Sequence, residues 1–298
     1  MNKLLSIVVV ALLPTVQGKA QGNLLTEVNE HYRGGDLRGA HTLVDQAVKD
    51  PALTAGAEIW VLRGFIYKDL YKQATGREAD ILRDEALASL YTATIKDQAK
   101  QYKESSVAAY NYLVKTLYND AAHALNSLQP DRAISLYTKY GENLRRLVPD
   151  TSTMRRDVDF KNALGTVYVK LFNENREQLS WYDKAVETYR QVLSLESTNY
   201  GANYNLATLY YNRGVYNIQR ITAENDIPGL QEIQEVSREF FSEALPYMLK
   251  AHHMRPNRPE TILGLEGIHY SLQDEEQSKH YRHLFEELQH DEQREKDQ

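Results

Sequence analysis

Cysteine is absent from the 298-residue chain, and glycine (15) and proline (8) are scarce. Without cysteine the chain has no disulfide, no zinc–thiolate site, no cysteine nucleophile and no cysteine-linked lipid anchor. Because tight turns depend on glycine and proline, their scarcity argues against an all-β fold. These absences leave a chain that must be stabilised by packing between longer elements.

Basic residues are also few relative to acidic ones, since Lys and Arg total 35 against 41 Asp and Glu, a net charge of -6. No long basic run occurs. Binding to nucleic acid without sequence preference requires a lysine- and arginine-rich footprint, so we expect no nucleic-acid partner. Apolar residues make up 42% of the chain, a normal share for a globular protein, which excludes wholesale disorder.

The first twenty residues have the three-part layout of a signal peptide. Lys3 gives a positive start, residues 4–13 (LLSIVVVALL) are apolar apart from one serine, and small Gly18 and Ala20 stand two apart. The apolar run is shorter than the roughly 20 residues that span a bilayer. We therefore expect cleavage before Gln21, a periplasmic or secreted location, and no stable membrane insertion afterwards.

The remaining chain shows the apolar spacing of helices. Residues 203–214 (NYNLATLYYNRG) place apolar side chains at i, i+3, i+4 and i+7 and end at Gly214, where we expect the helix to stop. Residues 240–256 form a second amphipathic stretch that Pro256 closes. The two stretches predict a pair of packed helices.

This pair resembles the tetratricopeptide repeat family. The residues that match its alternation of large and small packing positions are Leu206, Ala207, Tyr210, Gly214 at the turn, Ala244, Met248, Ala251 and Pro256. The resemblance implies that the small residues allow the two helices to cross closely. Residues 203–205 (NYN) and 244–247 (ALPY) are in addition similar to exported repeat proteins of Bacteroidetes.

The small residue of the second helix recurs along the chain, at Ala40, Ala86, Ala133, Ala185, Ala244 and Ser278. Only the last two are separated by 34 residues, the period of the family. Longer spacings predict longer helices or insertions, of which residues 72–83 and 216–236 are the most obvious. We expect an all-α superhelix of about six helix pairs over residues 21–290, followed by a charged, frayed tail at 291–298; an irregular helical bundle is the alternative.

Catalytic motifs are lacking. The chain has no GxxxxGK[ST], GxGxxG, GxSxG or HExxH sequence, so we expect neither an enzyme nor a cofactor. Glu276, His280, His283 and Glu287 would share one face of the last helix and could hold zinc or copper. Because that helix is terminal and highly charged, we interpret this face as solvated surface and expect no metal.

The family resemblance also implies which residues face a binding groove, because the first helix of each pair lines the concave side. In the fifth pair these would be Tyr204, Thr208, Tyr211 and Asn212, and in the fourth Asn162, Thr166 and Lys170. Tyr168 and Tyr210 stand at motif positions and are interpreted as structural.

These observations favour an exported protein–protein interaction scaffold that binds an extended peptide or a partner helix of the cell envelope in its concave groove. The alternative is an envelope protein that binds a small molecule or glycan through the insertions at residues 72–83 and 216–236.

Overall fold

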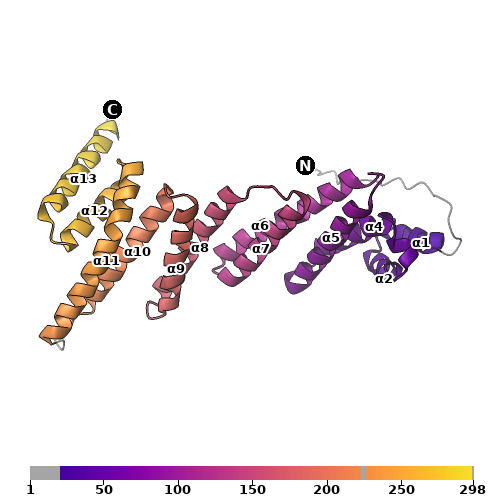
Figure 1. Ribbon diagram of the computed structural model, residues 1–298, viewed down its shortest axis with the longest axis horizontal. Helices are drawn as coiled ribbons and strands as arrows, with labels where there is room; N and C mark the ends of the chain where they lie inside the picture. The colour runs from indigo at the N-terminus through magenta and orange to yellow at the C-terminus, as the bar shows by residue number, and fades with distance from the viewer. Residues whose placement is uncertain (1–20, 223–225, 297–298) are drawn as a thin grey trace. The chain divides into compact units, whose positions relative to one another are not determined.

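The computed structural model describes residues 21–222 and 226–296, so the predicted signal peptide lies outside the described residues. Within them the chain is built from thirteen helices and no strand (Figure 1). The helices are α1 (Gln21–Arg33), α2 (Leu37–Ala47), α3 (Pro51–Thr54), α4 (Glu58–Tyr71), α5 (Gly76–Lys96), α6 (Lys103–Asn126), α7 (Pro130–Leu147), α8 (Met154–Glu174), α9 (Leu179–Leu195), α10 (Tyr200–Gln219), α11 (Ile227–Met254), α12 (Pro259–Ser271) and α13 (Glu275–Lys296).

The helices form two compact units, which we describe separately. Unit 1 comprises the chain up to residue 119 together with residues 136–151, and unit 2 comprises residues 120–135 and everything from residue 152 onward. Unit 1 therefore holds the pairs α1/α2 and α4/α5, and unit 2 holds α8/α9, α10/α11 and α12/α13. Helices α6 and α7 contribute residues to both units.

The predicted six pairs are confirmed, with the single-turn helix α3 as an addition. Each predicted small residue lies on the second helix of its pair and is buried: the five alanines are 0% exposed and Ser278 is 4% exposed. A small buried residue at every helix crossing is the arrangement that the tetratricopeptide resemblance implies. The fold class, an all-α helical repeat, follows directly from this regularity.

Small residues on the first helices complete the crossings. A Cβ atom added to Gly64 would lie 2.6 Å from Leu90 Cγ, and one added to Gly214 would lie 2.6 Å from Phe241 Cε1. These contacts correct one prediction: Gly214 does not end its helix, because α10 continues to Gln219. Because Gly214 has no side chain, the ring of Phe241 can pack against α10 at this position, and no turn forms there.

The longer spacings between repeats come mostly from longer helices. Residues 72–83 contain only a short turn before α5, and 216–236 contain the end of α10 and the first turns of the 28-residue α11. Asp226 caps α11 by accepting a hydrogen bond from the Gly229 amide at 2.9 Å. The described parts of both insertions are thus largely helical.

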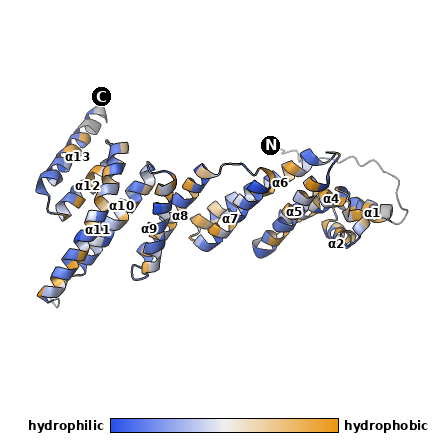
Figure 2. Ribbon diagram, viewed as in Figure 1, coloured by the Kyte–Doolittle hydropathy of each residue, from blue (hydrophilic) through white to orange (hydrophobic). Residues whose placement is uncertain are grey.

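Apolar residues are distributed along each helix among hydrophilic ones (Figure 2). In the described part of the chain, no helix is both long enough and apolar enough to cross a membrane. The last helix, α13, remains helical to Lys296. Fraying of the tail from Asp291 therefore stays a prediction.

Candidate functional site

A cleft opens on unit 2 between α8 and α10, the first helices of the fourth and fifth pairs. Its empty space is about 540 Å³ and is open to solvent. Both helices and the turn after α8 supply its polar rim, and the floor is apolar. The lining residues are Thr166, Val169, Phe172, Asn173, Arg176, Tyr189, Asn205, Thr208, Leu209, Asn212, Arg213 and Tyr216.

The floor of the cleft depends on a close approach between α8 and α9. A Cβ atom on Gly165 would lie 2.7 Å from Tyr189 Cε1, so the absence of a side chain lets the tyrosine ring lie against α8. The Tyr189 hydroxyl then lies 3.3 Å from Thr166 Oγ1 at the edge of the cleft. Burial raises the pKa of Tyr189, which therefore stays protonated and can act as donor or acceptor there.

Three of the seven predicted groove residues line this cleft: Thr166 on α8, and Thr208 and Asn212 on α10. Thr166 uses its hydroxyl locally, since it donates to the Asn162 carbonyl oxygen at 3.0 Å. Asn212 is exposed and its side chain has no hydrogen bond within the described part of the chain. An unpartnered amide at the rim of a cleft can both donate and accept a hydrogen bond.

The other four predicted residues lie outside the cleft lining. Asn162 donates its amide to Asn199 Oδ1 at 3.2 Å and so joins α8 to the N-terminal cap of α10. Lys170 is exposed on α8. Tyr204 stacks on the ring of Tyr200, with centroids 6.0 Å apart, and Tyr211 packs against Phe241 at 5.6 Å. Both tyrosines thus take part in packing.

Sequence reasoning missed the charged end of the cleft. Arg176 Cζ lies 5.2 Å and Arg213 Cζ 5.6 Å from the ring centroid of Tyr216. Tyr216 follows Asn212 by one helical turn, so it belongs to the same face. It was missed because the helix was expected to stop at Gly214; continuing the periodicity past that glycine would have found it.

The tyrosines interpreted as structural are buried at helix seams. Tyr210 is 5% exposed, accepts a hydrogen bond from Arg190 Nη2 at 2.8 Å and stacks on Tyr247. Tyr168 is 4% exposed and stacks on Trp181 with ring centroids 5.7 Å apart. Neither ring lines the cleft.

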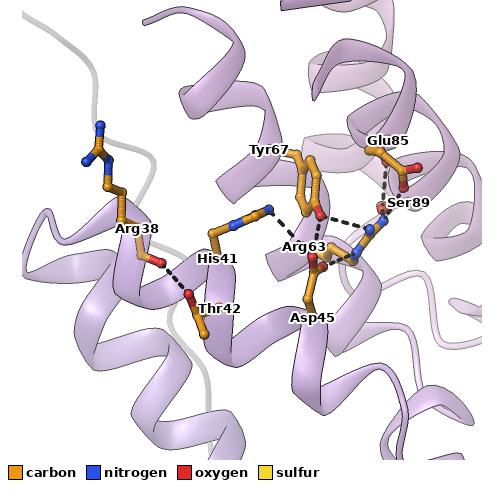
Figure 3. Close-up of polar contacts among 8 residues, drawn as sticks. All are labelled: Arg38, His41, Thr42, Asp45, Arg63, Tyr67, Glu85 and Ser89. Atoms are coloured by element: carbon orange, nitrogen blue, oxygen red, sulfur yellow. Dashed lines mark hydrogen bonds and ion pairs between the residues drawn. The ribbon is translucent and has the colours of Figure 1, made fainter. Parts of the chain in front are cut away.

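Unit 1 holds a polar network among α2, α4 and α5 (Figure 3). Arg63 on α4 donates from Nε to Asp45 Oδ1 on α2 at 3.0 Å, and its Nη1 lies 2.9 Å from Glu85 Oε2 on α5. Tyr67 donates to Asp45 Oδ2 at 2.6 Å, and Ser89 accepts from Arg63 Nη1 at 2.7 Å. Burial and the bond to Asp45 raise the pKa of Tyr67 well above its usual range. The network connects three helices by contacts within the chain.

The histidine face of α13 forms an ion pair of its own. His283 Nε2 lies 3.3 Å from Glu287 Oε1, and both side chains are mostly exposed. Among the described residues, no three His, Cys, Asp or Glu side chains are grouped so that they could hold a metal ion.

No family model matches the chain, and no curated protein matches it. Several solved structures are similar in fold. A TPR repeats protein from Bacteroides fragilis is 18% identical, with a TM-score of 0.41 over 83% of this chain and 97% of that one. The MamA protein is 20% identical, with a TM-score of 0.25 over 80% of this chain and 97% of that one.

A third solved structure is the IFIT1 monomeric mutant with Gppp-AAAA, which is 13% identical, with a TM-score of 0.35 over 91% of this chain and 60% of that one. The sequence identities and TM-scores of all three are low, so the function of this chain is argued from its own residues.

Proposed function

We propose that the protein is an exported interaction scaffold and that unit 2 binds an extended peptide segment of a cell-envelope partner in the cleft between α8 and α10. The observation that carries this proposal is the cleft itself: an apolar floor bounded by amide, hydroxyl and guanidinium groups on the first helices of two consecutive pairs. Binding sites commonly combine such a floor with a few placed polar groups.

The free amides of the rim support a peptide as the occupant. Asn173 and Asn212 are exposed on opposite walls, and neither side chain has a hydrogen bond within the described residues. An extended peptide presents backbone N–H and C=O groups that an asparagine amide can satisfy together. Val169 and Tyr216, which are half-buried in the lining, supply apolar surface on which a side chain of the peptide can pack.

A peptide-display selection tests the proposal. Residues 21–298 are immobilised and a random library of extended peptides is selected for binding. The Asn212→Trp variant fills the cleft with an indole from an exposed position, and the matched control Asp183→Trp places the same side chain on the exposed side of α9. Peptides that bind the wild type and the control but not Asn212→Trp are expected.

The proposal is wrong if no peptide is enriched, or if the enriched peptides bind Asn212→Trp as tightly as they bind Asp183→Trp. The location is tested separately: residues 1–298 expressed in a bacterium should yield an envelope-fraction chain that begins at Gln21. A chain that keeps Met1 and stays in the cytoplasm would contradict export but would leave the proposal of peptide binding in the cleft unaffected.

A further inference from the structure

The charge of the cleft is opposite to that of the chain. Acidic residues exceed basic ones, 41 to 35, yet the cleft lining includes Arg176 and Arg213 and no aspartate or glutamate. Within the described part of the chain, neither arginine is ion-paired, and their recorded contacts are with aromatic side chains. Two guanidinium groups in a lining without a carboxylate give this cleft a positive charge that favours an anionic occupant.

Three guanidinium groups lie over the ring of Tyr216: that of Arg220, 5.6 Å from the ring centroid and outside the cleft lining, and those of Arg176 and Arg213, which belong to the lining. The two of the lining lie 5.2 and 5.6 Å from the centroid, so they are no farther apart than the sum of these distances. Stacking on a ring restricts a guanidinium group while leaving its N–H edges available for a carboxylate. Tyr216 therefore prepares two adjacent positions for anions at one end of the cleft.

On the basis of the proposed peptide-binding function, we propose that the cleft selects an acidic segment in which two carboxylate side chains lie two residues apart. In an extended strand every second side chain faces the same way, and the two are about 6.6 Å apart. That spacing is within the largest separation that the two guanidinium groups of the lining can have over one ring. Each carboxylate would pair with one arginine, and the intervening backbone would meet the amide of Asn212.

Fluorescence anisotropy with defined peptides tests this specificity. The probe is a labelled peptide of about twelve residues with both termini blocked, in which Glu and Thr alternate; the comparison peptide replaces each Glu by Gln. A third probe carries the Glu sequence with a free C-terminus, which separates side-chain carboxylates from a terminal one. A single-stranded RNA of about twelve nucleotides reports on phosphate as the anion.

The protein variants are matched in charge. Arg176→Gln with Arg213→Gln removes both cleft cations, whereas Arg38→Gln with Arg155→Gln removes two exposed arginines that the cleft does not contain. The cleft pair is expected to weaken binding of the Glu peptide by about tenfold or more, and the control pair by less than about twofold. The Gln peptide should bind wild type about as weakly as the Glu peptide binds the cleft variant.

Three outcomes would overturn the inference: equal affinity for the Glu and Gln peptides, equal losses in the two double variants, or tighter binding of the RNA than of the Glu peptide. Neutral peptides that emerge from the display selection and are lost in Asn212→Trp would leave the peptide-binding function intact and refute its acidic specificity. Failure of the selection itself would remove both.

Discussion

Tyr67 in unit 1 and Tyr210 in unit 2 occupy the same place in their pairs, three residues after the small residues Gly64 and Ala207. Tyr67 donates its hydroxyl to a carboxylate, Asp45, at 2.6 Å, whereas Tyr210 accepts from a guanidinium group, Arg190, at 2.8 Å. Tyr67 also accepts from Arg63 Nη2 at 3.1 Å, so both hydroxyls accept from a guanidinium group and Tyr67 has a carboxylate partner in addition. The tyrosine itself is a packing residue in both units, and its polar partner is free to vary.

The two units also differ in how their arginine side chains are used. Arg63 of unit 1 contacts Asp45, Glu85 and Ser89, so its charge is used to connect helices. Arg213 of unit 2 lies at a cleft wall, over a tyrosine ring. The charge of Arg63 is thus satisfied within unit 1, whereas that of Arg213 lines a cleft that is open to solvent. This difference supports the proposal that unit 2 binds the partner.

The largest expected effects concern what the two units share. Ala86→Leu in unit 1 and Ala185→Leu in unit 2 each force a bulky side chain into a fully buried helix crossing. Each should lower the free energy of unfolding of its unit by about 1–3 kcal/mol. Urea denaturation, with hydrogen exchange to locate the loss, measures this. A crossing that accepts leucine without loss would show that its unit is not packed as a repeat.

The next effect separates the units. Arg63→Met leaves Asp45 and Glu85 without their shared partner and should destabilise unit 1 by about 1–2 kcal/mol, a value reduced because both carboxylates reach water. Arg213→Met should change the stability of unit 2 by no more than about 0.5 kcal/mol, because the chain does not use that charge internally. Equal losses would abolish the distinction between an internal network and an open cleft.

A smaller effect tests the two tyrosines. Tyr67→Phe removes a donor to Asp45 and an acceptor for Arg63, and should cost about 1 kcal/mol. Tyr210→Phe removes one acceptor of Arg190, which keeps its hydrogen bond with Tyr247 and is exposed to water, so the loss should be smaller. Thermal unfolding of the two variants gives the comparison, and a larger loss for Tyr210→Phe would contradict it.

The smallest effect is a pH dependence confined to unit 2. Burial, with some help from His253 and His280, holds the pKa of His252 below its usual value of 6.5. The unfolded chain therefore binds this proton more readily than the folded one, and the stability contributed by neutral His252 is lost as pH falls below about 6.5. His252→Gln should reduce the fall in melting temperature between about pH 7 and pH 5 by about one or two degrees. An unchanged fall would remove His252 as its source.

Much of the fold could be predicted from the sequence because its determinants are local. Small residues such as Ala185 and Ser278 recur at fixed places on apolar helix faces, and a buried crossing requires them. Helix ends were harder: Gly214 looks like a terminator in sequence, but its role is set by Phe241, a residue of another helix. Tertiary packing therefore determines the role of Gly214, and the local sequence pattern does not reveal it.

The site was only partly predictable for the same reason. The tetratricopeptide resemblance predicted Thr166, Thr208 and Asn212 as groove residues, and all three line the cleft. The resemblance could not tell that Tyr211 packs against Phe241, because the direction of a tyrosine ring depends on its neighbours. Arg176 lies in the turn that follows α8 and lines the cleft from there. Helical periodicity does not extend into a turn, so it could not predict this position.

The central claim is that the cleft of unit 2 binds the peptide and that unit 1 does not contact it. Hydrogen–deuterium exchange of residues 21–298, with and without a saturating display-selected peptide, tests it most directly. We predict slower exchange in residues 166–176 and 205–216, with α4 and α5 unchanged. Slower exchange centred on α4 and α5, with no change along α8 and α10, would contradict the account.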